Sequence, residues 1–343
     1  MVLRPSNVLI GLVGDVGGTN ARFAIARIYG DETELEHCHS LACARFDDFY
    51  GALDAYFAKV GETPRLDFAI LAVAGPVREG EIRFTNLDWV VRESALRHKT
   101  GATVVKLIND YAALAYGLPH LRSADSHTIG PALTGYGGVY AVMGAGTGFG
   151  ASVLIDSPTG AVCLSTESGH VAFSPVGPLE LELDRVMRRR LGRVTVEMLL
   201  SGNGLVNIYQ AMCEVHDYKT LELSAAEITD LDGDAAPGCR ETVDAFWDVM
   251  AGVAGDFVLS HGATAGIFIA GGIAPKLMNY LDAKRFRARM EDKPPMSAMV
   301  EAVPCRIITH AFPALLGAAN ALSHQEMQLV SRPDMAQPHI HIS

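Results

Sequence analysis

The sequence predicts a two-domain α/β protein built on a duplicated hairpin with a glycine-rich tip. Its 343 residues amount to about two domains of ordinary size, at ~150 residues each. A buried strand at residues 8–13 runs through a glycine-rich turn at 14–19 into an alternating strand at 21–27. The same order returns at residues 139–155. A repeat spacing of about 130 residues suits two related domains and not a solenoid.

Composition narrows the possible function classes. The chain is 49% hydrophobic and 20% charged, which is typical of a folded globular protein. Its formal net charge of −11 argues against a nucleic-acid partner and against an anionic membrane surface. Six cysteines without a CxxC pair indicate reduced thiols in a cytoplasmic enzyme. We expect no export signal, and no membrane span either, because the uncharged stretch at 128–155 holds eight glycines.

The remaining elements alternate between strands and helices, so we expect a mixed sheet in the first half and a helix-rich second half. Strands are expected at 66–74, 82–84, 103–108 and 266–270, and helices at 47–60, 180–190, 196–200, 204–215, 241–261 and 313–322. Residues 331–343 are polar and expected to be loose. Their His339 and His341 are interpreted as part of a solvated tail, with a metal contact as the alternative.

The first glycine-rich turn has the composition of a phosphate site. It places a carboxylate, a hydroxyl and unencumbered backbone N–H groups directly after a buried strand. Asp15 can hold Mg²⁺ through water, because this ion keeps part of its hydration shell. The alternative is a tight hairpin that needs glycine only for positive φ. The candidate residues are Gly14, Asp15, Val16, Gly17, Gly18, Thr19 and Asn20.

Two further glycine clusters join this candidate nucleotide site. Gly146, Thr147 and Gly148 form the second tip, and two such tips can hold a polyphosphate between them. Gly271 and Gly272 follow a buried strand and can let an adenosine approach bare backbone, although a strand-to-helix turn is the simpler interpretation. The chain has no Gly-Lys dipeptide and no G-x-G-x-x-G order, so the P-loop and Rossmann alternatives fail.

Asp110 is the candidate general base. It follows Asn109 at the end of a predicted strand, where α/β sheets usually place their chemistry. A sugar hydroxyl is a poor nucleophile at neutral pH, and an aspartate can accept its proton during phosphoryl transfer. The alternative is that Asp110 caps the N-terminus of a helix at 111–118.

Four more polar residues are candidate sugar ligands. Glu167 and His170 stand three residues apart, and Glu197 lies further along the chain. Carboxylate and imidazole groups can pair with the donors and acceptors of vicinal hydroxyls. Asn86 can add another polar contact, with a turn residue as the alternative. His170 has an alternative as a satisfied structural histidine, and Glu197 as a solvated helix carboxylate.

Taken in order, six motifs resemble the bacterial glucokinase family, and the resemblance extends over residues 8–322. They are Gly14-Asp-Val-Gly-Gly-Thr-Asn-Ala-Arg22, Asn109-Asp110, Gly144-Ala-Gly-Thr-Gly148, Glu167-x-Gly-His170, Leu200-Ser-Gly-x-Gly204 and Phe268-Ile-Ala-Gly-Gly-Ile273. The resemblance implies a two-domain actin-like (ribonuclease-H-type) ATPase fold with a duplicated mixed β-sheet and a helix-rich larger domain. We place the small α/β domain at 1–118 and 311–328, the large α/β domain at 119–310 and a loose tail at 329–343.

The resemblance also implies an activity: ATP-dependent phosphorylation of D-glucose at its 6-hydroxyl, the first step of glycolysis. Asp110 would be the base, and Asn109, Glu167, His170 and Glu197 would bind the sugar. The first turn and the second tip would contact the phosphates of ATP together with Mg²⁺, and Gly271 and Gly272 would lie near the adenosine. Domain closure on glucose and a homodimer are expected from the same likeness.

The sequence differs from related sugar-kinase families in ways that argue against a structural zinc site and against a DNA-binding repressor. Residues 171–183 hold no cysteine, so we expect no structural zinc of the kind that ROK (repressor/ORF/kinase) sugar kinases carry. The first strand begins near residue 8, which disfavours a DNA-binding repressor. Ser168 stands where many close relatives have glycine. A kinase for mannose or an N-acetyl sugar, and a non-catalytic sugar sensor, remain alternatives, although a sensor has no need of Asp110.

Overall fold

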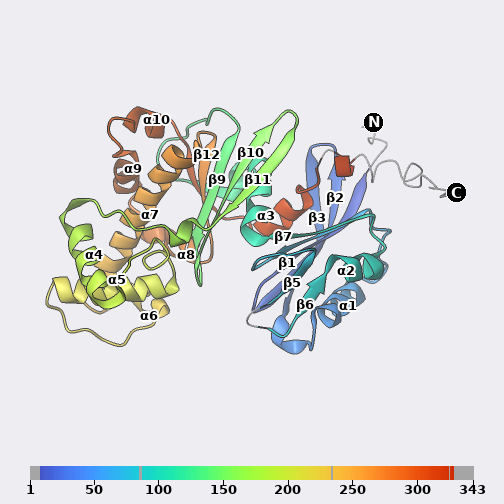
Figure 1. Cartoon of the computed structure of the whole chain (residues 1–343), viewed down its shortest axis with the longest axis horizontal. Helices are drawn as coiled ribbons and strands as arrows, with labels where there is room; N and C mark the ends of the chain where they lie inside the picture. The colour runs from blue at the N-terminus through green and yellow to red at the C-terminus, as the bar shows by residue number, and fades with distance from the viewer. Residues whose placement is uncertain (1–7, 85–86, 233–234, 324, 328–343) are drawn as a thin grey trace. The chain divides into compact units, whose positions relative to one another are not determined.

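The computed structural model describes residues 8–84, 87–232, 235–323 and 325–327, and its internal contacts divide the chain into two units. Unit 1 takes in the described residues of the ranges 1–121, 156–163 and 311–343, and unit 2 those of 122–155 and 164–310. Each unit has its own sheet with helices packed on it, which confirms the expected α/β class (Figure 1). The finer domain boundaries that the sequence suggested, at residues 118 and 310, stay predictions.

Unit 1 is built on a five-stranded sheet in the order β3-β2-β1-β4-β7. Strand β1 pairs antiparallel with β2 and parallel with β4, and β4 pairs parallel with β7. Because of this register, Val16, Val73 and Asn109 at the ends of the parallel strands lie side by side at one edge. The strands are β1 (Leu9–Val16), β2 (Asn20–Tyr29), β3 (Glu32–Ala42), β4 (Phe68–Val73) and β7 (Val104–Asn109).

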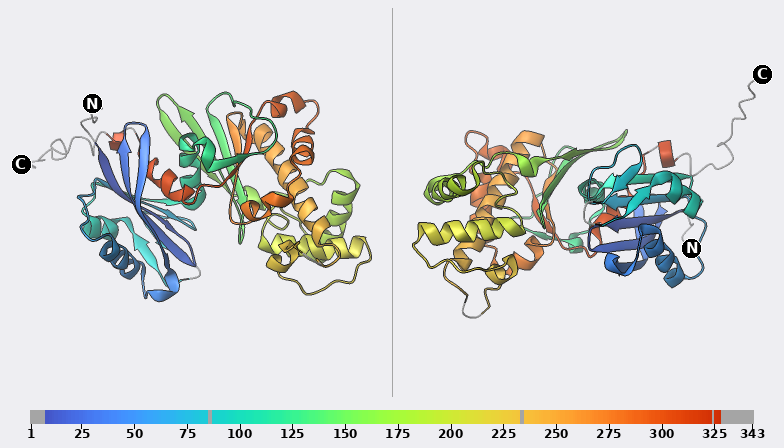
Figure 2. Two further views of the ribbon diagram at one scale, coloured as in Figure 1. Left: turned by 180° about the vertical axis from the view of Figure 1, so that it is seen from behind. Right: turned by 60° about the horizontal axis from the view of Figure 1, so that its bottom comes forward.

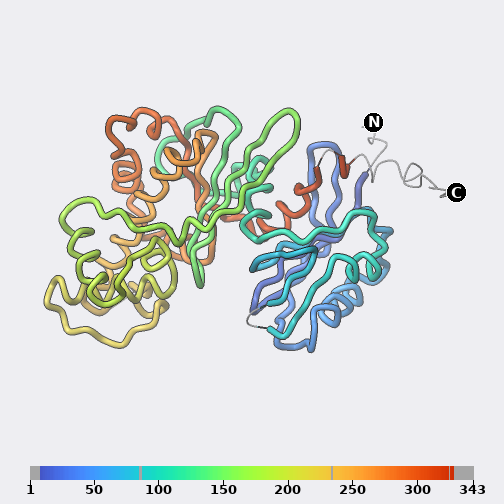
Figure 3. The backbone as a smooth tube through the Cα atoms, viewed as in Figure 1, coloured from blue at the N-terminus to red at the C-terminus, as the bar shows by residue number. Residues whose placement is uncertain are grey.

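Helices cover both faces of this sheet. Successive strand residues point to opposite faces, so Leu12 packs with α1 (Phe49–Val60) and α2 (Glu93–Thr100), whereas Val13 packs with α11 (Pro313–Ala319). Figure 3 traces the chain back to unit 1, where α11 in red contacts β1 and α3 (Asp110–Gly117). A short hairpin of β5 (Glu81–Arg83) and β6 (Val90–Arg92) completes the unit.

Unit 2 repeats the central arrangement in a six-stranded sheet of order β11-β10-β9-β12-β13-β8. Strand β9 pairs antiparallel with β10 and parallel with β12, as β1 does with β2 and β4. This repetition confirms the predicted duplication of the glycine-tipped hairpin. The strands are β8 (Ser126–Thr128), β9 (Val139–Ala145), β10 (Phe149–Ser157), β11 (Gly160–Thr166), β12 (Gly266–Ala270) and β13 (Cys305–Ile308).

A long helix forms the centre of the helical part of unit 2. Helix α7 (Cys239–His261) buries residues such as Phe246 and Met250 all along its length, because apolar side chains recur on each of its turns. Figure 2 shows this helix among the other helices of the unit. The other helices are α4 (Gly177–Leu191), α5 (Gly202–Val215), α6 (Ala225–Thr229), α8 (Ala274–Leu277), α9 (Ala283–Glu291) and α10 (Ser297–Glu301). In the described part of the chain, no helix combines the length and the apolar character that crossing a membrane requires.

The structure corrects three local expectations. Gly14, Asp15 and Val16 belong to β1 and not to the turn, because they stay paired with β2. The helix expected at 196–200 is wrong: this segment forms turns, since the N–H of Glu197 donates to the carbonyl of Gly169. The polar edge strand β3 was not predicted. All six cysteines are free thiols, as expected.

Candidate functional site

The first glycine hairpin, in unit 1, carries a partly buried carboxylate. Asp15 on β1 faces Arg22 on β2 in the strand register, and Arg22 Nη1 donates to Asp15 Oδ2 at 2.7 Å. Burial nevertheless raises the pKa of Asp15, against the opposing effect of the guanidinium. The N–H of Gly17 closes the turn by donating to the carbonyl of Asn20 at 3.0 Å. A single carboxylate of this kind suits Mg²⁺, which usually keeps several waters and binds phosphates besides.

Asn109 and Asp110 occupy the junction between β7 and α3. Asn109 is the N-cap of α3: its Oδ1 accepts from the backbone N–H groups of Tyr111 and Ala112, at 3.0 and 3.2 Å. Its Nδ2 donates to Asp110 Oδ1 at 2.9 Å, and the N–H of Tyr111 donates to the same oxygen at 2.9 Å. Asn109 therefore fills the capping role that was the structural alternative for Asp110, whose carboxylate is fixed in orientation.

Asp110 has a strongly shifted acidity. Burial raises its pKa to about 6, and the negative charge of Asp15 acts in the same direction. Hydrogen bonds from Tyr111 and Asn109 to the carboxylate oppose this rise. Because β1 and β7 run parallel and end at the same edge, the sheet itself places these two carboxylates near one another. A partly buried aspartate with a pKa of about 6 is the kind of group that general base catalysis requires.

The second glycine hairpin, in unit 2, lies against Glu197. The N–H of Gly146 donates to the carbonyl of Gly148 at 2.8 Å, and the N–H of Phe149 donates to Glu197 Oε2 at 2.8 Å. A Cβ at Gly148 would stand 2.7 Å from Glu197 Oε2, so only glycine fits there without displacing the carboxylate. The N–H of Gly202, at the start of α5, donates to the carbonyl of Gly146 at 2.9 Å and ties the tip to this helix.

Glu167 and His170 lie on an exposed turn of unit 2. Glu167 is the N-cap of the short 3₁₀ segment Ser168–His170 and His170 is its last residue, with His170 Nε2 3.9 Å from Glu167 Oε2. The side chains of Glu167 and His170 are 92% and 63% exposed, so His170 is not the buried structural histidine that was its alternative. The N–H of Glu197 donates to the carbonyl of Gly169 at 2.9 Å, which brings the third candidate ligand of this unit to the same turn.

Gly271 and Gly272 end β12 beside the second hairpin. Gly271 has φ +85°, and a Cβ there would overlap the carbonyl of Ala145 on β9. Gly272 and Gly146, in contrast, have open space where a Cβ would stand. Bare backbone next to open space is what a nucleotide needs for close approach, so these glycines fit a phosphate-bearing ligand.

The structure groups the candidates by unit. Asp15, Asn109 and Asp110 meet at the sheet edge of unit 1, and the hairpin tip at 146–148, Glu167, His170, Glu197 and the 271–272 pair belong to unit 2. Asn86, His339 and His341 lie outside the described residues. Within the described ranges, no three His, Cys, Asp or Glu residues gather as metal ligands do. The absence of structural zinc stays a prediction.

Sequence reasoning missed two supporting arginines. Arg22 pairs with Asp15, and Arg193 Nη2 donates to the carbonyl of His170 at 3.1 Å. The first had a signal, because a hairpin with a three-residue turn at 17–19 sets Asp15 opposite Arg22. The second had none, since a contact over 23 residues depends on how the turns at 170 and 193 fold together.

Comparisons with known proteins identify the family of this chain. The family model described as Glucokinase matches residues 12–325. A glucokinase of Caulobacter sp. (strain K31) is 38% identical over 318 residues, which cover 93% of this chain and 96% of the relative. A crystal structure of glucokinase from an Antarctic psychrotroph has a TM-score of 0.86 at 34% identity and covers 91% of this chain and 98% of its own.

A more distant structure shares the fold. The ROK family glucokinase of Streptomyces griseus, solved with glucose and AMPPNP, has a TM-score of 0.58 at 17% identity, over 92% of this chain and 99% of its own. The fold is therefore that of the sugar kinases with an actin-like ATPase architecture. Within this class, the chain belongs to the glucokinase family, and it is an enzyme of sugar phosphorylation.

Proposed function

We propose that this enzyme transfers the γ-phosphoryl group of ATP to the 6-hydroxyl of D-glucose, giving glucose 6-phosphate and ADP at the first step of glycolysis. The observation that carries the proposal is Asp110. It is the first residue of α3, it is held by Asn109, and burial raises its pKa to about 6. A sugar kinase needs such a base to take the hydroxyl proton as the oxygen attacks phosphorus.

Each oxygen of the Asp110 carboxylate has a separate task in this proposal. Oδ1 accepts the N–H groups of Asn109 and Tyr111, which fix the plane of the carboxylate. Oδ2 receives the proton of the 6-hydroxyl. A base that is oriented before the sugar binds loses little freedom in the transition state, and this is where positioning contributes to rate.

The other sugar hydroxyls bind to Asn109, Glu167, His170 and Glu197, with Asn86 as a further ligand. The exposure of Glu167 and His170 supports this role, because their donors and acceptors are open to a ligand. The glucose in the Streptomyces griseus structure supports the same substrate class. Each hydroxyl of glucose offers one donor and one acceptor, which carboxylates and an imidazole can satisfy together.

ATP binds to the two hairpins and to the 271–272 glycines. The open space at Gly146 and Gly272 supports contacts with phosphate and adenosine, and the residues from Gly14 to Asn20 supply the other backbone donors. Asp15 would hold Mg²⁺, which would supply positive charge against the phosphate oxygens. AMPPNP in the Streptomyces griseus structure supports a nucleotide donor. The proposal also places the enzyme in the cytoplasm as a homodimer.

The test is ADP production by purified protein with Mg²⁺ and ATP, across glucose, mannose, fructose, galactose, N-acetylglucosamine and no sugar. A strong preference for glucose supports the proposal. Turnover of another sugar would keep the base assignment and overturn the specificity of Glu167, His170 and Glu197. Folded protein without activity on any sugar would contradict the proposal and favour a sensor.

A further inference from the structure

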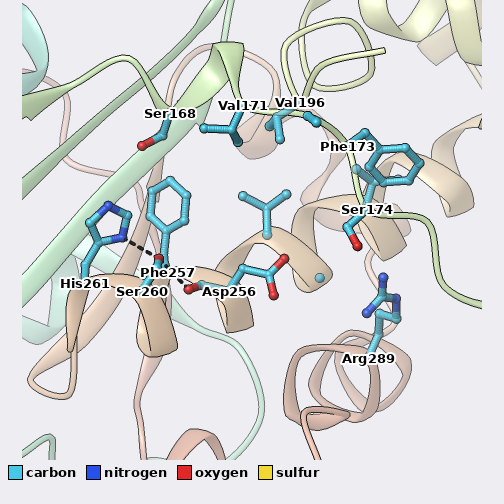
Figure 4. A pocket seen from close by; sticks show the side chains of 14 residues that line it. Ser168, Val171, Phe173, Ser174, Val196, Asp256, Phe257, Ser260, His261 and Arg289 are labelled. Carbon is cyan, nitrogen blue, oxygen red and sulfur yellow. Dashed lines mark hydrogen bonds between the residues drawn. The ribbon is translucent and has the colours of Figure 1, made fainter. Parts of the chain in front are cut away.

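Unit 2 holds a cavity of about 320 Å³ behind the turn that carries Glu167 and His170 (Figure 4). Its walls come from residues 168–174, Val196, helix α7 and Arg289 of α9. Neither Asp110 nor the glycine hairpins line it. The volume lies at the lower end of the range for small-molecule sites, which suits a ligand of roughly ten to twelve heavy atoms. The proposed reaction has no use for this cavity.

The guanidinium of Arg289 in the cavity wall has a hydrogen-bond donor without an acceptor among the described residues. Arg289 Nε and Nη2 donate to Glu180 at 3.0 and 3.1 Å, but Nη1 is buried and has no hydrogen-bond partner among the described residues. A buried N–H without an acceptor is costly, so an acceptor brought by a ligand would be favoured. Figure 4 shows the guanidinium and the Ser174 hydroxyl among the groups that line the cavity, and this hydroxyl can also donate to a ligand.

The remaining wall determines what else the ligand must be. Asp256 is paired with Lys293 of α9, so its charge is compensated. Burial lowers the pKa of His261, which leaves its ring neutral at pH 7, and the Ser260 hydroxyl lies 3.0 Å from His261 Nδ1. Most of the other lining side chains are apolar: Val171, Phe173, Val196, Val249, Val253 and Phe257. A small carboxylate with an apolar body matches this combination of one spare guanidinium donor and an apolar wall.

The cavity and the candidate sugar ligands share their backbone. Ser168 and Val171 line the cavity, and Glu167 and His170 are their direct neighbours in sequence. Val196 precedes Glu197 in the same way, and its N–H donates to the carbonyl of Val171 at 3.1 Å. A ligand that packs against these residues therefore restricts the same two segments that present the sugar ligands.

We propose that this cavity is a second small-molecule site, which binds a small carboxylate with an apolar body and thereby tightens sugar binding. The effect of the carboxylate on sugar affinity rests on the proposed function, because it needs Glu167, His170 and Glu197 to be sugar ligands. The binding of the carboxylate itself does not rest on it. Occupancy orders the shared segments before the sugar arrives, which is positive coupling, and by linkage the sugar must tighten the carboxylate equally.

The probe is 3-phenylpropionate, titrated calorimetrically into the full chain, with 3-phenylpropan-1-ol as the uncharged analogue. We expect saturable binding of the carboxylate at one site, with the alcohol at least tenfold weaker. Equal affinity for both, or no binding of either, would overturn the proposal. Arg289→Lys keeps a cation against Glu180, and we expect it to weaken the carboxylate about tenfold while leaving the alcohol unchanged. Unchanged carboxylate affinity in this variant, folded by circular dichroism, would also overturn it.

A pair of neighbouring variants locates the site. Ser260→Trp puts a large side chain at a lining position on the exposed side of α7, and we expect it to abolish binding. Leu259→Trp is the matched control, because Leu259 is the next residue, is 38% exposed and does not line the cavity. Binding that survives Ser260→Trp or is lost in Leu259→Trp would place the ligand elsewhere and contradict the proposal.

The coupling has its own measurement. With 3-phenylpropionate saturating, we expect the Kd for glucose to fall about threefold, and glucose to tighten the carboxylate by the same factor. Carboxylate binding without any change in glucose affinity would overturn the coupling and leave the site. If glucose binds neither with nor without 3-phenylpropionate while the carboxylate still binds, the result would instead contradict the proposed function.

Discussion

The carboxylates of the two units differ in how firmly the protein holds them. Asp110 in unit 1 is partly buried, accepts two N–H groups on one oxygen and has a pKa raised to about 6. Glu167 in unit 2 is 92% exposed, and the ring of His170 lies 3.9 Å from it. Under the proposed function, the contrast teaches that the group which exchanges a proton is held in place by the protein, whereas a group which recognises hydroxyls stays open to its ligand.

The largest effect that tests this contrast is the loss of the base. Asp110→Asn keeps the shape and the bonds from Asn109 and Tyr111, but it cannot accept a proton. We expect kcat to fall about 10²–10⁴-fold with glucose affinity largely kept, measured by ADP production and by calorimetry. Asp54→Asn is the control, because this carboxylate of α1 is 58% exposed and pairs only with Lys99 in the described structure. A kcat like that of the wild type would remove Asp110 from the chemistry.

The acidity of Asp110 predicts a pH limit on activity. A general base works only when it is deprotonated, so kcat/KM should fall below pH 6, approaching tenfold per pH unit. Burial is the main cause of the raised pKa of Asp110. The measurement is kcat/KM for glucose from pH 4.5 to 8 at constant ionic strength, with circular dichroism at each pH. A flat profile in folded protein between pH 5 and 7 would contradict the assignment.

If the exposed Glu167 carboxylate binds a glucose hydroxyl, its removal should change KM for glucose and not kcat. Glu167→Gln removes a charge from a hydroxyl-binding position without touching the base. We expect KM for glucose to rise about tenfold while kcat stays within about threefold, the pattern of lost binding that is shared by ground and transition states. Glu182→Gln, on the exposed face of α4, is the matched control. An equal fall in kcat would mean that Glu167 acts in the transition state, and the contrast between the units would weaken.

Local patterns predicted much of this fold and less of the site. The two hairpins, the long helix α7 and the junction at Asn109 followed from apolar periodicity and glycine turns, because these depend on residues close in sequence. The edge strand β3 was missed, since its residues are mostly half-exposed and polar. The Glu197 contact with Phe149 was also missed, because it joins residues 48 positions apart, and only the folded chain brings them together. The cavity behind Glu167 left no trace in the sequence for the same reason.

The smallest expected effect is on stability, and it has the opposite sign from the effect on activity. Because the folded protein raises the pKa of Asp110 from 3.8 to about 6, folding favours its protonated form, and ionisation costs stability as pH rises through this window. Asp110→Asn removes that cost, so we expect the variant to be about 1–2 kcal/mol more stable than the wild type at pH 8. Below about pH 3 the carboxyl is protonated in the folded and in the unfolded protein, and the difference should vanish. Urea unfolding at pH 8 and pH 3 measures this, with Glu167→Gln as the surface control. A variant that is inactive yet more stable at pH 8 would show that unit 1 holds its carboxylate at the expense of stability, whereas a destabilised variant would mean that the negative charge itself supports the fold.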